Sequence, residues 1–179
     1  MLVFSILGLG AIAANPCWAD TKHPKQEKHM AFDYINQPPA FWKSNLSDEA
    51  YRVCREKGTE IAGSGQYDKF YEKGVYYCAC CGGDYALFDS KAKYDSGTGW
   101  PSFWAPIDPS HINLHTEEDA LSRLLGATTE VRCARCLSHL GHVFDDGPTD
   151  KTGKRYCMNS VALSFTPEGE KPKRTYPEP

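Results

Sequence analysis

The sequence lacks any long run of lysine or arginine. Its 179 residues carry a formal net charge of −3 and an isoelectric point of about 6.1. Proteins that bind nucleic acids usually present a basic face to the phosphates, so this balance argues against a nucleic-acid partner. Hydrophobic residues make up 41% of the chain, and the mean hydropathy is −0.52. These values are ordinary for one globular domain with a modest core and polar ends.

The sequence also lacks an apolar stretch of the roughly 20 residues that span a membrane. Residues 2–14 are small and apolar, and residues 1–19 carry no charge. This pattern is typical of a secretion signal, with Cys17-Trp18-Ala19 as a small-x-small cleavage site. We therefore expect export, to the periplasm or another compartment outside the cytoplasm, without stable membrane association. No Lys or Arg precedes the apolar run, so a retained anchor or a misassigned start, with a membrane-anchored or cytoplasmic protein, is the alternative.

Strand and helix patterns do not alternate, which argues against a parallel sheet. Ser47, with acidic residues after it, predicts a helix N-terminus, and Gly58 predicts the position just beyond the helix end. The predicted fold is mainly β, with antiparallel sheets and short N-terminal helices. Alternating or apolar segments broken by turns predict strands at 75–78, 85–88, 128–133, 142–144 and 160–165. We divide the chain into a signal (1–19), a polar arm (20–40), a compact domain (41–166) and a tail (167–179).

Four of the eight cysteines form two C-x-x-C pairs, Cys78/Cys81 and Cys133/Cys136. Two such pairs match a tetrahedral zinc site, in which each pair presents two sulfurs to one metal. With all four positions filled by protein, no position is left for a substrate. We therefore predict one structural zinc per chain. In an exported protein, two local disulfides are the alternative.

A separate cysteine, Cys157, is the leading candidate for chemistry. A thiolate is a better nucleophile than a thiol, and a nearby positive charge such as Arg155 lowers the pKa of a thiol. His139 and His142 precede Cys157, and we expect Asn159 two residues beyond it on the same strand face. The alternative is that Cys157 is a small buried hydrophobic residue. The two histidines would alternatively bind a second metal, although no carboxylates stand at evident spacing.

Trp100, between Gly99 and Pro101 in a predicted loop, is either an exposed binding surface for a substrate or a core residue. No H-x-E motif is present, which argues against a zinc deaminase. Neither C-x-x-C pair lies in the βαβ setting of a thioredoxin-like oxidoreductase. The main rival is a non-catalytic zinc module that binds a protein or RNA partner. That reading leaves Cys157, the histidines and the Trp100 loop without a role.

Several motifs in compatible order and spacing carry a family resemblance between residues 42 and 165. Besides the two C-x-x-C pairs they are YRVCREKGTE (51–60), SGTGWPSF (96–103), SHLGHVFDDGP (138–148) and RYCMNS (155–160). Together they resemble methionine sulfoxide reductase B. The resemblance implies a twisted antiparallel β fold and thiol-dependent reduction of the R epimer of methionine sulfoxide, free or in proteins.

The resemblance also implies roles by position. Cys157 would attack the sulfoxide sulfur, while His139, His142 and Asn159 would assist protonation of the leaving oxygen. Trp100 would pack against the S-methyl group of the substrate, and the zinc would lie away from the site. Attack leaves a sulfenic acid on Cys157, which a second thiol must resolve. The implied partner is a thioredoxin-like reductant, the implied role is protein repair after oxidative damage, and we expect a monomer.

The sequence departs from the common family pattern at the second thiol. Many members carry the resolving cysteine where this chain has Thr98, whereas Cys54 replaces a threonine that is common in the family. We interpret Cys54 as the resolving thiol, forming a Cys54–Cys157 disulfide. The alternative is that Cys54 only packs and an external thiol reduces Cys157 directly. Ala62-Gly63 replaces the usual Pro-Phe, so one wall of the substrate pocket departs from the family pattern, and Cys80 has no assigned role.

Overall fold

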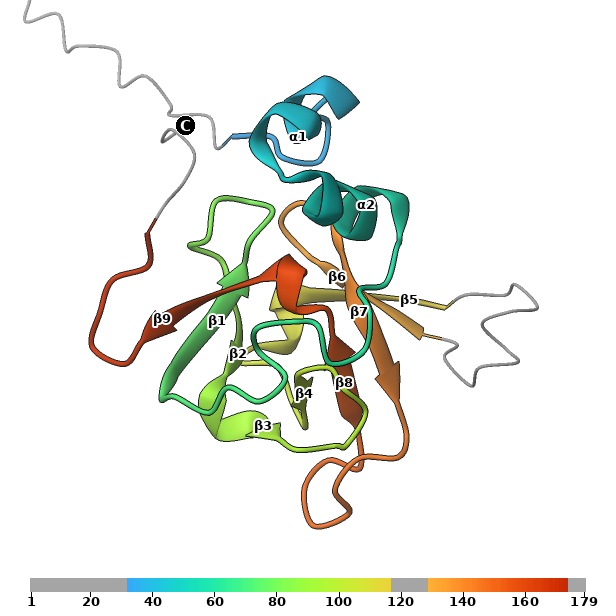
Figure 1. Cartoon of the computed structure of the whole chain (residues 1–179), viewed down its shortest axis with the longest axis vertical. Helices are drawn as coiled ribbons and strands as arrows, with labels where there is room; N and C mark the ends of the chain where they lie inside the picture. Colours follow the sequence, from blue (N-terminus) through green and yellow to red (C-terminus); the bar gives the residue numbers. More distant parts are fainter. Residues whose placement is uncertain (1–31, 117–128, 174–179) are drawn as a thin grey trace, which may run out of the picture. The chain divides into compact units, whose positions relative to one another are not determined.

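The computed structural model describes residues 32–116 and 129–173 of the chain (Figure 1). The predicted signal, most of the predicted arm and the end of the predicted tail lie outside these residues. The helices are α1 (Pro39–Asn45) and α2 (Asp48–Glu56), and the strands are β1 (Gly74–Cys78), β2 (Ala86–Asp89), β3 (Lys93–Tyr94), β4 (Ser102–Phe103), β5 (Ile112–Thr116), β6 (Thr129–Cys133), β7 (His139–Phe144), β8 (Arg155–Met158) and β9 (Leu163–Pro167). Three short 3-10 turns are η1 (Ser90–Ala92), η2 (Pro109–His111) and η3 (Ser160–Ala162).

Two sheets organise these strands. One sheet has the order β2–β1–β9, and the other has the order β3–β4–β8–β7–β6–β5. Every pairing between the described strands is antiparallel, which confirms the predicted fold class. Figure 1 shows both helices gathered at one end of the fold, and α2 packs against β7 and η3. No described helix has the length and apolar character needed to cross a bilayer.

Aromatic side chains join the two sheets. Phe103 of β4 stacks on Phe88 of β2, with ring centroids 4.5 Å apart, and meets Tyr76 of β1 edge-on at 5.1 Å. All three side chains are fully buried. Burying one such ring contributes about 1.5–3 kcal/mol, so this cluster is a main source of the attraction between the sheets.

Helix α2 begins at the predicted N-cap, and Gly58 lies just beyond its end as predicted. The Ser47 side chain accepts a hydrogen bond from the Ala50 N–H at 3.2 Å, as expected of an N-cap. At the other end Lys57, not Gly58, adopts the left-handed conformation, with φ of 57°. Gly58 is needed for space instead, since a Cβ there would lie 3.0 Å from the Arg52 carbonyl oxygen and 2.5 Å from its side chain.

The predicted strand at 160–165 is wrong over its first half, where residues 160–162 form η3 and β9 begins at Leu163. The cause is Glu60, which comes from a distant part of the chain. Its buried carboxylate accepts hydrogen bonds from the backbone N–H groups of Ser160 (2.7 Å) and Val161 (3.0 Å). These donors are therefore unavailable to a strand ladder.

Candidate functional site

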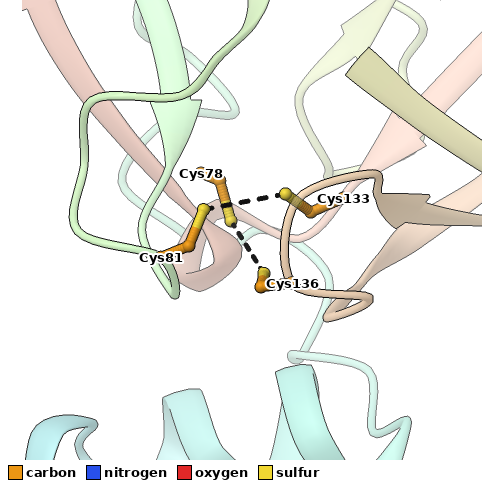
Figure 2. A group of neighbouring side chains, drawn as sticks. All are labelled: Cys78, Cys81, Cys133 and Cys136. Carbon is orange, nitrogen blue, oxygen red and sulfur yellow. Dashed lines mark hydrogen bonds between the residues drawn. The ribbon is translucent and has the colours of Figure 1, made fainter. Parts of the chain in front are cut away.

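The four cysteines of the C-x-x-C pairs converge in one buried cluster. Cys78 ends β1 and Cys133 ends β6, and the turn after each strand brings Cys81 and Cys136 back beside them (Figure 2). All four sulfurs lie within 4.8 Å of one another, and Cys78–Cys136 and Cys81–Cys133 are each 3.7 Å apart. Zn–S bonds of about 2.3 Å in a tetrahedron place neighbouring sulfurs about 3.8 Å apart. The cluster therefore fits one four-thiolate metal ion.

The same geometry disagrees with two local disulfides. The closest sulfur pairs run between the two C-x-x-C turns, not within either of them, and all four thiols are unbridged. Within residues 32–116 and 129–173, this cluster is also the only group of three or more His, Cys, Asp or Glu residues arranged to hold a metal. A second metal on His139 and His142 thus has no supporting ligands in the described chain.

Helix α2 is tied to the second of these turns. The Arg55 guanidinium donates hydrogen bonds to the Cys136 carbonyl oxygen (3.0 Å) and to Ser138 Oγ (3.2 Å). Ser138 Oγ in turn lies 3.2 Å from Cys136 Sγ. The guanidinium also covers the face of the Trp42 ring of α1, 4.4 Å from its centroid. The position of α2 is therefore coupled to the conformation of the cysteine cluster.

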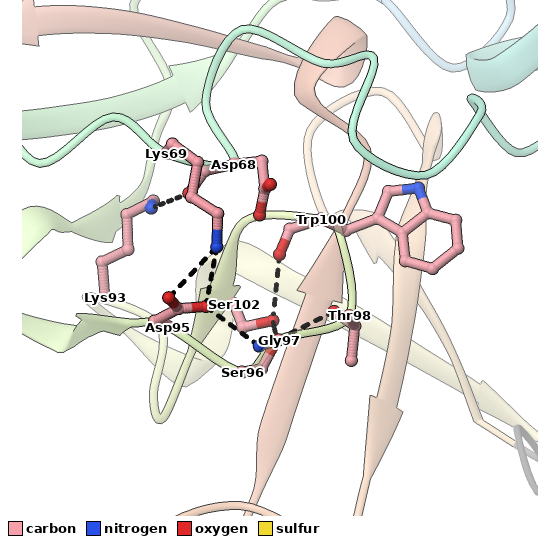
Figure 3. A network of polar contacts seen from close by, with 9 residues as sticks. All are labelled: Asp68, Lys69, Lys93, Asp95, Ser96, Gly97, Thr98, Trp100 and Ser102. Atoms are coloured by element: carbon pink, nitrogen blue, oxygen red, sulfur yellow. Dashed lines mark hydrogen bonds and ion pairs between the residues drawn. The ribbon is translucent and has the colours of Figure 1, made fainter.

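Cys157 lies in β8, separate from the cluster and partly exposed. Its Sγ is 3.9 Å from Thr98 Oγ1. Thr98 belongs to a chain of hydroxyl groups in which Ser96 Oγ contacts both Thr98 Oγ1 (2.8 Å) and Ser102 Oγ (2.7 Å), as Figure 3 shows. Burial raises the pKa of the Cys157 thiol, while Arg155, Thr98 and Ser102 oppose that rise. The resting thiol is therefore protonated at neutral pH, with donors already in place for its thiolate.

The strand register places a row of polar side chains across one face of the six-stranded sheet. Ser102 of β4 is opposite Cys157, Cys157 is opposite His142 of β7, and His142 is opposite Glu130 of β6. Directly opposed residues of antiparallel strands project to the same face. His139 joins the row because its ring lies 5.2 Å from the His142 ring. The structure thus brings the predicted nucleophile and both predicted histidines together.

Asn159 lies close to this row but not where we predicted it. Pairing of β8 with β7 ends at Met158, so Asn159 is beyond the strand and precedes η3. Its side chain donates to the Leu140 carbonyl oxygen (3.0 Å) and accepts from the Glu60 N–H (2.9 Å). These bonds tie β7 to the segment after α2. Asn159 therefore lies one residue beyond the strand in which we predicted it.

Trp100 occupies the loop that leads to β4 and is partly buried. Its indole N–H donates to the Glu60 carbonyl oxygen at 3.2 Å, and Figure 3 shows its ring extending away from the hydroxyl chain. The exposed segment Ala62-Gly63 packs beside Gly99, the residue before Trp100, and the Gly63 N–H donates to the Gly99 carbonyl oxygen at 2.8 Å. Trp100 is neither a fully buried core residue nor a free loop tip, because one edge of its ring is fixed and its neighbours are small.

Cys54 is buried in α2, and the structure does not bring it to Cys157. Its thiol neighbour is Cys80, whose pKa is raised chiefly by the Cys54 side chain. In the part of the chain that is described, no hydrogen-bond-range contact joins the sulfurs of Cys54 and Cys157. A disulfide between them requires movement of α2 or β8.

Sequence reasoning missed Glu60 and Glu130, two buried carboxylates that organise this region. One signal for Glu130 was available, because a charged residue beside Val131 in a predicted strand is unusual unless it is paired. For Glu60 no local pattern pointed to η3, since its partners lie about 100 residues away.

Comparison with known proteins gives a consistent result. The family model described as SelR domain matches residues 46–167. The chain is 51% identical to the peptide methionine sulfoxide reductase MsrB of Hahella chejuensis over 133 residues, which covers 74% of this chain and 91% of that protein. It is 46% identical over 143 residues to the protein of that name from Acinetobacter baumannii, covering 80% and 98% of the two chains. It is 48% identical over 139 residues to the protein of the same name from Methanosarcina mazei, covering 78% of this chain and 94% of that protein.

Proposed function

Because this chain belongs to the SelR domain family of peptide methionine sulfoxide reductases, we propose that it reduces methionine sulfoxide by nucleophilic attack of Cys157. The observation that carries this proposal is the placement of Cys157 opposite His142 on one sheet face, with both side chains partly accessible. A sulfoxide bound there would lie between a thiol and an imidazole. This pairing of nucleophile and proton carrier is what the reaction requires.

The proton balance of the first step suits a thiol that is protonated at rest. A sulfoxide and a thiol give a thioether and a sulfenic acid, so oxygen moves from the substrate sulfur to the Cys157 sulfur and no proton is gained or lost overall. The Cys157 proton needs only to reach the sulfoxide oxygen as the S–S contact forms. His142, and His139 behind it, supply a path for that proton, and Thr98 stabilises the thiolate transiently formed.

Selectivity for the R epimer follows, in this proposal, from the two walls of the site. The imidazole side would receive the oxygen, while the ring of Trp100 would contact the S-methyl group. Exchanging methyl and oxygen, as in the S epimer, would place the oxygen against an indole face and leave it without a donor. The small residues Ala62 and Gly63 leave room beside Trp100 for substrate residues, which favours sulfoxide within a protein over the free amino acid.

The direct test is turnover of the two epimers with dithiothreitol as reductant. We expect the R epimer to be reduced and the S epimer to be left unchanged. Cys157→Ser should abolish reduction while retaining bound metal, because Cys157 lies outside the four-cysteine cluster. Equal rates on both epimers, or full activity of the serine variant, would contradict the proposal.

We propose that Cys54 resolves the sulfenic acid by displacing its oxygen as water and forming a Cys54–Cys157 disulfide, which a thioredoxin-type dithiol then reduces. The side chains Arg55 and Lys57, which bond α2 to the sheet, lie at the C-terminal end of the helix, so few polar contacts must break for the helix to move.

Treatment with one equivalent of substrate and no reductant, followed by peptide mapping, should give the Cys54–Cys157 crosslink. Cys54→Ser should release one equivalent of methionine and then fail to cycle with thioredoxin. Normal cycling by that variant would leave Cys54 as a packing residue.

We further propose one structural zinc per chain in the cysteine cluster, a role in protein repair, and export directed by residues 1–19, which lie outside the described residues. The fit of the sulfur spacing to Zn–S bonds supports the metal assignment. Elemental analysis should find about one zinc per chain. Mass spectrometry of the mature N-terminus would test export, and an intact Met1 on protein from the native host would contradict it.

A further inference from the structure

Glu130 is a fully buried carboxylate on β6, the second strand from one edge of the six-stranded sheet. Its Oε1 lies 2.9 Å from His139 Nδ1, and its Oε2 is 3.0 Å from Lys57 Nζ and in contact with the Arg132 guanidinium. Burial alone would raise the pKa of this carboxyl, but the hydrogen bonds from His139, Arg132 and Lys57 outweigh burial and hold the pKa well below its usual range. Glu130 is therefore ionised throughout the neutral range.

The two carboxylate oxygens have different partners. Oε2 receives the two cationic side chains, so Oε1 is left to the imidazole. An ionised carboxylate only accepts hydrogen bonds, which means that His139 Nδ1 must carry a proton whatever the charge of the ring. In the neutral ring the proton is then on Nδ1, and Nε2 is an acceptor.

Nε2 of His139 is buried, and within the described residues it has no hydrogen-bond partner. A buried polar atom without a protein partner is uncommon and is consistent with a catalytic role or a bound water. Here the ring of His142 is 5.2 Å away, and the thiol of Cys157 is one strand further on. The unpaired nitrogen therefore belongs to the same polar row as the nucleophile.

We propose that Glu130 is a positioning residue that fixes His139 in its Nδ1-protonated form, so that Nε2 is kept free to exchange a proton with the sulfoxide oxygen directly or through His142. This inference rests on the proposed function. Glu130 is on β6 and Cys157 is on β8, and β7 lies between these strands. Glu130 acts through His139, and Lys57 at the end of α2 keeps its second oxygen occupied.

The sharpest variant is Glu130→Gln, which preserves shape but carries one oxygen and one NH2 group. Because Lys57 and Arg132 are donors, the amide oxygen should turn toward them and the NH2 group toward His139. Nδ1 then has to accept, and the proton moves to Nε2. We expect nitrogen-15 NMR at pH 8 to show His139 protonated on Nδ1 in the wild type and on Nε2 in the variant. The rate of single-turnover reduction should fall at least about 10-fold, with KM changed less than about twofold.

Two further variants separate positioning from general damage. Glu130→Asp keeps the charge and should retain the Nδ1-protonated form, with a rate between those of the wild type and the Gln variant. Lys57→Gln removes a partner of Oε2 and leaves the contact between Oε1 and His139, so it should lower the melting temperature while leaving His139 protonated on Nδ1. Zinc content is measured for each variant as a check on folding.

Either of two results would overturn the inference: a wild-type His139 protonated on Nε2, or a Glu130→Gln protein that moves the proton yet keeps the wild-type rate. The wild-type spectrum decides the first even if the Gln variant does not fold. Failure of the proposed function is distinguishable, because then the wild type itself reduces neither epimer.

Discussion

Opposing influences act on the thiol of Cys157. Burial in β8 disfavours the thiolate, whereas Arg155, the Thr98 hydroxyl and Ser102 favour it, and burial is the largest contribution. Arg155 is itself held by a two-point hydrogen bond to Asp146, with distances of 2.8 and 2.9 Å. The guanidinium therefore has a fixed position near the sulfur. The Asp146 carboxylate partly neutralises its positive charge. A thiol in this setting resists oxidation at rest and gains nucleophilicity when its proton is removed.

The pH dependence of alkylation tests this description. A raised pKa means that the protonated form of Cys157 persists in the folded protein, so the rate of reaction with iodoacetamide should keep rising beyond pH 8.5, the approximate pKa of a free cysteine. Thr98→Val removes a donor to the thiolate and should raise the pKa further, slowing alkylation at pH 8 by about two- to fivefold. Peptide mass spectrometry quantifies the Cys157 product. A rate that is already constant at pH 7 would show a thiolate at rest and refute the assignment.

Glu60 gives a second prediction for a single residue. Its carboxylate accepts from two backbone N–H groups of η3, and its own backbone bonds Asn159 and Trp100. Glu60→Ala leaves two donors without acceptors, so we expect the free energy of unfolding in urea to fall by about 2–4 kcal/mol. Glu56→Ala on the exposed face of α2 is the control, with a change within about 0.5 kcal/mol. Equal effects of the two changes would mean that the Glu60 contacts contribute little.

At the scale of elements, the sequence was informative where local chemistry decides the structure. Ser47 marked the start of α2, and alternation located β1, β2 and β6 to within a residue or two. The two-residue strands β3 and β4 were not predictable, because pairing with β8 across the sheet defines them. The start of β9 was misplaced for the same reason, because Glu60, which binds the backbone N–H groups of η3, lies about 100 residues away in sequence. The sequence identified Cys157 and the two histidines as candidate site residues. That their side chains lie on one face of the sheet could be seen only from the register of β6, β7 and β8.

The link between α2 and the cysteine cluster leads to a prediction at the scale of elements. Arg55→Lys keeps the charge but loses the planar guanidinium, whose Nη1 bonds both the Cys136 carbonyl oxygen and Ser138 Oγ while its face covers Trp42. We expect zinc to remain near one per chain, its release to a chelator to be several-fold faster, and amide exchange in α2 to increase. Arg52→Lys, on the exposed side of the same helix, should release zinc at the wild-type rate. If the Arg55 variant releases zinc at the wild-type rate, the contacts between α2 and the cysteine cluster do not affect metal retention.

At the scale of the whole described domain, the cysteine cluster connects the two sheets. Cys78 and Cys81 follow β1 of the three-stranded sheet, whereas Cys133 and Cys136 follow β6 of the six-stranded sheet. The aromatic contacts of Tyr76 and Phe103 join the same two sheets through the core. A metal ion in the cluster would therefore stabilise the domain by closing a second connection between sheets, at a distance from the thiol chemistry.

Removing one ligand separates that stabilising role from a catalytic one. Cys81→Ala should abolish zinc binding and lower the free energy of unfolding by on the order of 5 kcal/mol, because metal binding contributes to folding. For a domain of this size that corresponds to a fall in Tm of roughly 10–20 °C. Cys80→Ala is the matched control, since Cys80 is equally buried and adjacent but stands outside the four-sulfur group. It should keep about one zinc and lose far less stability.

Below its own melting temperature, the Cys81 variant should still release methionine in a single turnover, because Cys157 and His142 are positioned by the register of β7 and β8. Loss of zinc from both variants alike, or loss of single-turnover chemistry in a Cys81 variant that is still folded, would contradict a purely structural metal.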